Sequence, residues 1–323
     1  MTVELVSVII TTFNDDNYLD RLFLDLASQD LNGVSIEILH LEAGTYKKQR
    51  ALKNLRALGS SLRYFNIPRL GRTDALNKLM DVAQGELVIR LDARTHIPPN
   101  YVKKIIELSK KTGAENVGGV MLPIGESQNQ KFIAEVMKNP ICLGGAKFRG
   151  GEFTGEVDSV YLGAFNRQKI KVDYWFDNNG KISEDSELNF RIRQSGGRVV
   201  VDSSIIVEYF PRDGIKSFLR LCFNYGVGRG LFVLKHRTFS AFRQIVPPVF
   251  FLVILILLVA GFFNSIYFSL CFGLIFCYLF SLTLIASASV KSILEIFKFV
   301  AAISGCHFVW SLGLVFSPLY KKN

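Results

Sequence analysis

Acidic side chains stand where apolar segments of the chain end, and an acidic pair opens a later segment. Residues 85–92 form a short apolar run that ends in Asp92, and an earlier run ends in Glu42. Glu184 and Asp185 begin a segment with helical spacing. In a parallel α/β sheet, ligands bind outside the carboxyl ends of the strands. A carboxylate at such a point is placed to hold a metal ion, and the metal to hold a diphosphate.

The residue two positions after Asp92 departs from this pattern. A metal site of this kind would have a second carboxylate at position 94, where the chain has Arg94. Arg94 could itself pair with a diphosphate, because guanidinium groups bind phosphate oxygens bidentately. It could also be a surface residue that pairs with a neighbour. His96 is interpreted as a loop residue and not as a ligand.

The acidic pair also fits a purely structural role. Acids stand in the first turn of its predicted helix and Arg191 and Arg193 near its end, which is the charge order that the helix dipole favours. A carboxylate at a helix amino terminus ordinarily has a lowered pKa, which makes it a weaker base. Desolvation by a bound ligand would raise that pKa again.

The elements that must position these residues alternate between strand and helix patterns. Strand-like apolar runs occupy residues 6–12, 35–41, 62–67, 87–91, 117–121, 158–165, 199–201 and 205–209. Helical spacing follows several of them, as at residues 72–83 and 98–111. This alternation predicts an α/β domain over residues 1–212, with a mostly parallel sheet covered by helices on both faces. The glycine-flanked loop at residues 144–151 is either a mobile lid or a plain connection.

Charge and hydropathy are distributed unevenly along the 323 residues. The formal net charge is +10 and the mean hydropathy is +0.26. After Asp213 the only acidic residue is Glu295, and basic residues cluster over 213–243, just before the first uncharged run. We interpret 213–243 as basic amphipathic helices at an anionic cytoplasmic membrane face. Nucleic acid is not predicted as a partner.

Residues 244–320 read as a membrane region. The runs 245–263 and 266–286 carry no charge, and about 20 apolar residues span a bilayer as a helix, so they predict a transmembrane hairpin. A weaker third run at 299–319 is a possible span. Lysines between the second and third runs favour a cytoplasmic loop. Lysines at the chain end also favour the cytoplasm, but three full spans would place that end on the opposite side. Either the third run is re-entrant or interfacial, or the terminal lysines do not determine the sidedness of the chain end.

Other features of the chain indicate an intracellular protein. The first thirteen residues do not match a signal peptide, because Glu4 replaces the expected positive charge. The five cysteines show no metal-binding or redox spacing and are interpreted as small core residues in a reducing compartment. His307 lies inside an apolar run and is expected to face a helix partner.

Several collinear segments resemble glycosyltransferase family 2, whose members have the GT-A fold. They are residues 6–14, 37–45, 71–77, 85–92 and 184–188. Later segments are similar to the membrane-anchored subgroup that builds bacterial exopolysaccharides such as succinoglycan. These are residues 161–165, 183–193, 209–212 and 225–226. Departures from the family pattern are Arg94 in place of an acid or histidine, Ala43 in place of an aspartate, and Leu221 in place of a glutamine.

The resemblance implies a binding site for a nucleotide sugar, most readily a UDP-sugar. Thr12, Asn14 and Glu42 would contact the base and ribose. Asp74 and Asn77 would lie beside the donor. The resemblance also implies that Asp92 binds Mg²⁺ or Mn²⁺, which would assist departure of the diphosphate, and that Asp185 is the general base, with Glu184 as the competing candidate.

The leading hypothesis is an inverting glycosyltransferase of the bacterial inner membrane with a cytoplasmic catalytic domain. Its acceptor would be a polyprenyl-diphosphate-linked glycan at the bilayer surface. One alternative is a transferase that acts directly on polyprenyl phosphate. Another is a catalytically silent nucleotide-sugar-binding subunit of a polysaccharide assembly complex, which the departures from the family pattern suggest. A transporter is disfavoured, because two or three spans are few for a pore.

Overall fold

The computed structural model divides the chain into two compact units. It describes residues 5–14, 16–31, 33–44, 61–145, 148–149, 151–178, 183–239 and 241–321. The first unit comprises residues 1–124 and 146–210, and the second comprises 125–145 and 211–323. The sequence placed 125–145 in the nucleotide-binding domain, whereas contacts group this segment with the C-terminal part. Residue 45 of the segment 37–45, and residues 146, 147 and 150 of the loop 144–151, lie outside the described residues.

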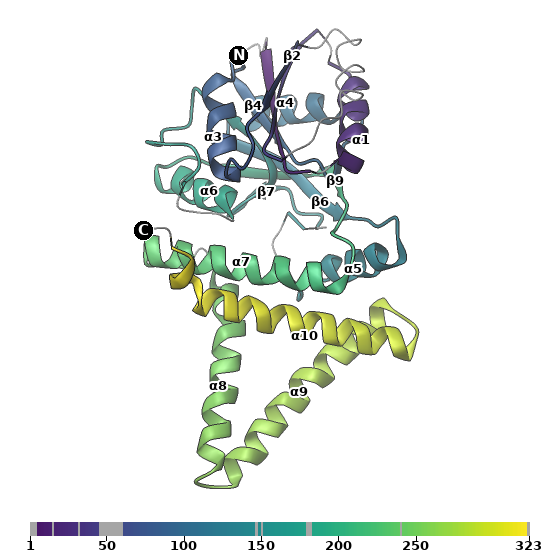
Figure 1. Cartoon of the computed structure of the whole chain (residues 1–323), viewed down its shortest axis with the longest axis vertical. Coiled ribbons are helices and arrows are strands. Elements are labelled where there is room, and N and C mark those ends of the chain that lie inside the picture. The colour runs from purple at the N-terminus through teal and green to yellow at the C-terminus, as the bar shows by residue number, and fades with distance from the viewer. Residues whose placement is uncertain are drawn as a thin grey trace. The chain divides into compact units, whose positions relative to one another are not determined.

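The described strands of the first unit form one mixed sheet (Figure 1). They are β1 (Leu5–Thr12), β2 (Ser35–Glu42), β3 (Ser61–Asn66), β4 (Leu87–Leu91), β5 (Thr95–His96), β6 (Asn116–Pro123), β7 (Gly155–Glu156), β8 (Tyr161–Asn166) and β9 (Val199–Tyr209). The order is β3-β2-β1-β4-β8-β6-β9-β5, with β7 also paired to β9. The longest pairings, β1–β2, β2–β3 and β6–β9, are parallel, which confirms the predicted sheet.

The two short strands predicted at 199–201 and 205–209 are one continuous strand. Asp202 of β9 lies opposite Gly119 of β6, but the next β6 residue, Val120, lies opposite Ile206. The extra residues of β9 form an irregularity in the register. A bulge of this kind interrupts the alternation of apolar residues without ending the strand, which is why the sequence pattern reads as two strands.

Helices cover both faces of the sheet, as predicted. The described helices of the first unit are α1 (Asp16–Ala27), α3 (Arg72–Val82), α4 (Tyr101–Thr112) and α6 (Glu184–Gln194). Successive strand side chains point to opposite faces. Val8 therefore shares a core with Leu22 of α1 and Tyr101 of α4, whereas Ile9 shares the other core with Leu76 of α3 and residues of α6.

The sheet topology places a ligand site at one edge. The chain leaves β1 toward β2 on one side, and β4 lies on the other side of β1. This reversal of direction is the topological switch point where α/β sheets bind ligands. Thr12 ends β1 opposite Glu42, and Asp92 directly follows β4. Three of the predicted site residues thus come from the carboxyl ends of adjacent strands.

The second unit is helical. Its described helices are α5 (Gln128–Lys138), α7 (Ile215–His236), α8 (Val246–Gly261), α9 (Ile266–Ser289) and α10 (Ile293–Val315), with short 3₁₀ turns at Phe242–Gln244 and Ser317–Tyr320. Figure 1 shows α7 and α10 side by side and α8 and α9 as a hairpin that leaves them. By length and composition α9 and α10 could each cross a membrane, and α8 is a shorter apolar helix.

Sequence reasoning did not predict α5. Its signal was present, because Ser127 and Gln130 have the spacing of a capping box. The Ser127 hydroxyl accepts the Gln130 N–H at 3.0 Å, and the Gln130 side chain in turn accepts the Ser127 N–H. The Gln130 amide also donates to the Pro211 carbonyl at 3.0 Å. This reciprocal cap supports the start of the helix and ties it to the chain just before α7.

Candidate active site

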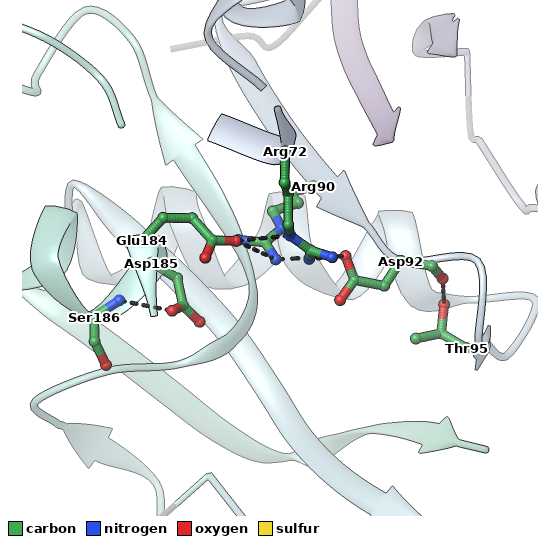
Figure 2. Close-up of polar contacts among 7 residues, drawn as sticks. All are labelled: Arg72, Arg90, Asp92, Thr95, Glu184, Asp185 and Ser186. Atoms are coloured by element: carbon green, nitrogen blue, oxygen red, sulfur yellow. Dashed lines mark hydrogen bonds and ion pairs between the residues drawn. The ribbon is translucent and has the colours of Figure 1, made fainter. Parts of the chain in front are cut away.

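Two arginines join the carboxylates at the sheet edge into one cluster (Figure 2). Arg72, the first residue of α3, donates from Nε to Glu184 Oε1 and from a terminal nitrogen to Asp92 Oδ1, both at 2.9 Å. Arg90 of β4 lies 3.1 Å from the same Glu184 oxygen and 3.4 Å from the same Asp92 oxygen. We call Arg72, Arg90, Asp92 and Glu184 the ion-pair cluster.

The charges of the ion-pair cluster hold its carboxylates ionised. The side chains of Arg90 and Glu184 are only 7% and 6% exposed, whereas Arg72 is 44% exposed. Burial alone would raise the pKa of Asp92 and of Glu184. The two guanidinium groups outweigh it and lower both pKa values below their usual range. Asp92, in turn, raises the pKa of Arg72, so the arginines stay charged.

Asp185 has the opposite shift. Burial raises its pKa above the usual value, and the neighbouring charge of Glu184 raises it further. One oxygen, Oδ1, accepts the backbone N–H of Ser186 at 2.8 Å. The sequence argument expected a lowered pKa at this helix amino terminus, but burial and the charge of Glu184 outweigh the arginine charges and the hydrogen bond from Ser186, which lower the pKa. Neighbouring carboxylates with pKa values pushed apart are the arrangement that assigns one to hold charge and the other to accept a proton.

A buried polar chain fixes the helix that carries both acids. Asn189 of α6 donates to Ser159 at 3.0 Å and accepts from Asn116 of β6 at 2.6 Å. All three side chains are buried. The Asn116 Oδ1 atom has no hydrogen-bond partner among the described residues, but a shift of α6 would leave further buried polar groups of this network unpaired. The position of Asp185 relative to the sheet is therefore set by these amides.

Glu42 is buried, and its carboxylate accepts hydrogen bonds from neighbouring segments of the chain. Its oxygens accept from the Thr12 hydroxyl at 2.5 Å, the Gly44 N–H at 2.5 Å and the Asn14 N–H at 3.1 Å. Asn14 has a φ of +56°, a left-handed conformation that asparagine tolerates better than most residues. A Cβ at Gly44 would lie 2.3 Å from the Asn14 side-chain oxygen. Glu42 thus shapes the loops after β1 and β2, while the Asn14 side chain is exposed.

Sequence reasoning missed His40, which completes this corner. Its Nε2 lies 2.7 Å from the Thr12 hydroxyl oxygen, and burial lowers its pKa to about 4. Because the single proton of Thr12 goes to Glu42, the neutral His40 ring donates from Nε2. The position of His40 within the apolar strand β2 was a signal that the sequence did contain. The hydrogen-bond partner of His40 could not be predicted, because Thr12 is 28 positions away along the chain.

Asp74 and Asn77 lie on α3, the helix that Arg72 begins. The Asn77 amide donates to the Phe176 carbonyl and accepts the Phe176 N–H, both at 2.8 Å, and also donates to Asn178 at 2.7 Å. Asn77 therefore holds the segment that precedes α6. Asp74 is half-buried in the first turn of α3.

Arg94 stacks on an aromatic ring of α1. Its guanidinium carbon lies 4.6 Å from the centre of the Tyr18 ring, and Tyr18 lies 5.3 Å from the Phe210 ring. The Arg94 carbonyl accepts the Phe210 N–H at 2.9 Å. Neither sequence interpretation included this cation–π contact, which orients Arg94 beside the loop after Asp92.

His96 lies in the short strand β5 and not in a loop, which corrects the sequence interpretation, and it anchors the end of the loop after Asp92. Its Nδ1 lies 2.8 Å from an Asp25 oxygen, which also accepts the Ile97 N–H at 3.2 Å. The Thr95 hydroxyl donates to the Asp92 carbonyl at 2.6 Å. Asp92 is therefore held by its own loop and by the ion-pair cluster.

The donor set fits a cation that is shared with a substrate and not one that the protein holds alone. Among the described residues, no group of three or more His, Cys, Asp or Glu side chains could hold a metal ion. The arginines contact Asp92 through Oδ1, and Figure 2 shows its other oxygen outside those contacts. Mg²⁺ is commonly bound by one or two carboxylates together with substrate phosphates, and Asp92 supplies one.

Comparison with known proteins gives relatives of similar length and one sequence family. A succinoglycan biosynthesis protein, ExoA, of Rhizobium meliloti (strain 1021) is 24% identical over 243 residues, which cover 74% of this chain and 73% of that protein. A dolichyl N-acetyl-alpha-D-glucosaminyl phosphate 3-beta-D-2,3-diacetamido-2,3-dideoxy-beta-D-glucuronosyltransferase of Methanococcus voltae is 23% identical over 245 residues, 72% of this chain and 75% of that protein.

Solved structures share the fold. The mannosyltransferase PcManGT of Pyrobaculum calidifontis, in complex with GDP-Man and Mn²⁺, matches 98% of this chain and 88% of its own, with a TM-score of 0.63 and 13% identity. TarS 1–349 of S. aureus, in complex with UDP-GlcNAc, matches 98% and 92%, with a TM-score of 0.51 and 15% identity. The family described as Glycosyl transferase family 2 matches residues 7–172, more than half of the sequence. The chain therefore belongs to glycosyl transferase family 2.

Proposed function

We propose that this glycosyltransferase moves a sugar from a nucleotide-sugar donor to a lipid-linked glycan, with inversion, in cell-surface polysaccharide synthesis. The observation that carries the proposal is the split between two adjacent carboxylates. Glu184 is ionised in the ion-pair cluster, whereas Asp185 has a raised pKa. A general base needs a pKa near the working pH, and Asp185 is shifted in that direction.

Asp185 accepts the proton of the acceptor hydroxyl as the hydroxyl oxygen attacks the anomeric carbon. The bond from that carbon to the donor diphosphate breaks, and the nucleoside diphosphate leaves with the electron pair. Attack from the face opposite the leaving group inverts the anomeric centre. Glu184 is the poorer base because two arginines stabilise its charge, and its own charge raises the proton affinity of Asp185.

The leaving diphosphate is neutralised at the other end of the cluster. Arg72 is the more exposed arginine, so phosphate oxygens can replace its carboxylate partners. Arg94, oriented on Tyr18, adds a second guanidinium beside the same loop. Asp92 would hold Mg²⁺ or Mn²⁺ together with the diphosphate, and the bound cation supplies Lewis-acid assistance to departure.

The nucleoside lies over the corner formed by Thr12, Asn14 and Glu42. Glu42 acts here as a positioning residue, because its oxygens are used by the chain. The exposed Asn14 side chain is the contact to the nucleoside, for which uridine is proposed. Asp74 and Asn77 act beside the donor through α3, and Asn77 aligns the segment that leads into α6.

The acceptor is proposed to be attached to a membrane lipid, such as a polyprenyl diphosphate, at the cytoplasmic face of the inner membrane. Support comes from the apolar C-terminal helices and from two relatives, one named for succinoglycan biosynthesis and one for a dolichyl-linked sugar phosphate. Residues 1–212 would form the catalytic domain, 213–243 the interfacial segment and 244–320 the membrane region. The name of the second relative describes transfer to a sugar that is already attached to dolichyl phosphate, which favours a lipid-linked glycan over direct transfer to a polyprenyl phosphate.

The test uses the full chain in lipid nanodiscs with radiolabelled UDP- and GDP-sugars and a lipid extract from bacterial membranes. We expect label to enter the lipid fraction, and proton NMR of the product to show an anomeric configuration opposite to that of the donor. A retained configuration contradicts the mechanism. Nucleotide binding without turnover supports instead the silent subunit suggested by Ala43, Arg94 and Leu221.

A further inference from the structure

Helices α7 and α10 of the second unit are in backbone contact. A Cβ at Gly226 of α7 would lie 2.0 Å from the Trp310 carbonyl oxygen, and a Cβ at Gly313 of α10 would lie 2.2 Å from the Phe223 carbonyl oxygen. Only glycine permits this approach. Small residues at such positions are typical of helix pairs that pack closely without a large side-chain core.

The contact continues along both helices in the same direction. Leu219 lies against Gly305, the sulfurs of Cys222 and Cys306 are 2.6 Å apart, and Gly230 lies against Ser317. Residue numbers rise together on the two helices, so α7 and α10 are parallel. Figure 1 shows the same alignment. Each turn of α10 is therefore at the level of a turn of α7.

The charges of α7 exclude it from the hydrocarbon core. Lys216, Arg220, Arg229 and Lys235 are distributed along its length. A lysine or arginine in the middle of a spanning helix is costly to insert into hydrocarbon, so four along one helix are incompatible with a span. Because the two backbones touch, α10 is confined to the depth of α7.

A second polar neighbour lies against α10. His307 is 2.9 Å from the Ile141 carbonyl oxygen, and the Cys306 sulfur is 3.6 Å from the Cys142 carbonyl oxygen. Both carbonyls belong to the turn after α5. Irregular backbone is not found exposed to lipid in the hydrocarbon region. The polar backbone on this side of α10 therefore also places the helix outside that region.

Helices α8 and α9 differ from α7 and α10, although the Tyr278 hydroxyl of α9 lies 2.9 Å from His307 Nδ1 of α10. They carry no charge, they pack on each other where Gly261 meets Phe268, and their large apolar side chains are exposed, for example Leu255 at 58% and Phe276 at 65%. The 16 residues of α8 measure about 24 Å. Local thinning of the bilayer and the apolar residues that flank α8 make up the remaining thickness.

We infer that α8 and α9 alone cross the bilayer, and that α7 and α10 lie together in its anionic headgroup layer. The exposed Ile293, Leu294 and Phe297 at the start of α10 reach the acyl chains. Lys298 and Lys321 remain among the lipid phosphates. The end of the chain is then on the same side as α7, which removes the conflict between the terminal lysines and a third span.

This inference rests on the proposed membrane location but not on the sugar chemistry. Length and composition qualify α10 as a span as well as α9, although α10 is the less hydropathic of the two. The difference between them lies in what each helix packs against, and membrane sidedness tests it. Loss of transfer activity would leave the sidedness result intact, and a wrong sidedness would leave transfer intact.

The test is cysteine labelling with a membrane-impermeant maleimide in intact cells. Reporter cysteines are introduced into the full chain after its five native cysteines have been replaced. We expect Asn264→Cys, in the turn between α8 and α9, to be labelled from outside. Two other reporters should be labelled only after permeabilisation. They are Leu319→Cys, near the end of the chain, and Glu107→Cys, which lies on the first unit. Labelling of Leu319→Cys in intact cells overturns the inference, whereas an unlabelled Asn264→Cys refutes the membrane hairpin itself.

Two further measurements do not need the cysteine-free chain. A C-terminal green fluorescent protein fusion should fluoresce and an alkaline phosphatase fusion should be inactive, and the reverse pattern overturns the inference. In the native chain, oxidation should cross-link Cys222 to Cys306. Gly226→Leu should abolish this cross-link, and Gly273→Leu, whose Cβ would meet nothing within 4 Å, should preserve it. Equal yields in both variants would show that α7 and α10 do not pack as described.

Discussion

Replacing Glu184 with glutamine separates the two roles assigned to the acidic pair. The substitution keeps the shape of the side chain but removes the charge that Arg72 and Arg90 contact at 2.9 Å and 3.1 Å. At an effective dielectric constant of about 20, charges at the second distance attract by about 5 kcal/mol. Desolvation offsets much of that attraction, and glutamine still accepts a hydrogen bond. We therefore expect the free energy of unfolding to fall by about 1–3 kcal/mol.

The same substitution should change the pH dependence of transfer in a defined direction. The charge of Glu184 is the second largest cause of the raised pKa of Asp185, so its removal lowers that pKa. Asp185 acts in its deprotonated form, and activity is lost as pH falls through its pKa. The acid limb of kcat/KM therefore moves to lower pH in Glu184→Gln, while transfer at neutral pH slows because the base is weaker.

The matched control is Glu187→Gln. Glu187 is also buried in the first turn of α6, but it pairs with Arg191 at 3.0 Å and not with the ion-pair cluster. It should lose stability without a shift of the acid limb. The measurements are pH–rate profiles and denaturant unfolding of the full chain in detergent. An acid limb that stays in place in Glu184→Gln, or moves equally in both variants, refutes the coupling between Glu184 and Asp185.

Three other predictions concern the donor side. Gly44→Ala should raise KM for the nucleotide sugar about tenfold, because the added Cβ would displace the Asn14 side chain. A tenfold change corresponds to about 1.4 kcal/mol of binding free energy. An unchanged KM contradicts this prediction. Arg94→Ala should weaken donor binding at saturating Mg²⁺, with partial recovery in Arg94→Lys; a silent substitution means that Asp92 and the cation act without it. His40, whose pKa is lowered to about 4, should make thermal stability fall as pH drops from about 6.5 toward 4, because only the unfolded chain binds its proton there. His40→Gln should flatten that dependence.

The elements of the fold were predictable where one physical pattern dominates. The run at residues 87–91 is buried on both faces, so it reads as a strand and is β4 with those bounds. β1, β2 and α3 are found within one residue of their predicted positions. β5 and β7, of two residues each, are too short to produce a period. They exist because β9 offers them a partner.

The site was predictable as far as the strand ends reveal it. Asp92 and Glu184 were expected at the site, and the structure brings them to the same two arginines. Arg72 and Arg90 themselves were not expected, because the contact of Arg72 with Glu184 joins residues 112 positions apart and no local pattern encodes it. The raised pKa of Asp185 depends on burial in the folded unit, whereas the helix dipole, which the sequence does show, acts in the opposite direction.

The central claim is that Asp185 removes the proton of the acceptor, and Asp185→Asn tests it most directly. The measurement compares donor binding by calorimetry with the rate of sugar transfer in a single turnover, for the wild type and the variant. The account predicts a donor dissociation constant within about threefold of the wild type and a transfer rate lower by about 10²–10⁴-fold, the usual contribution of a general base. Transfer at the wild-type rate with intact donor binding would contradict it.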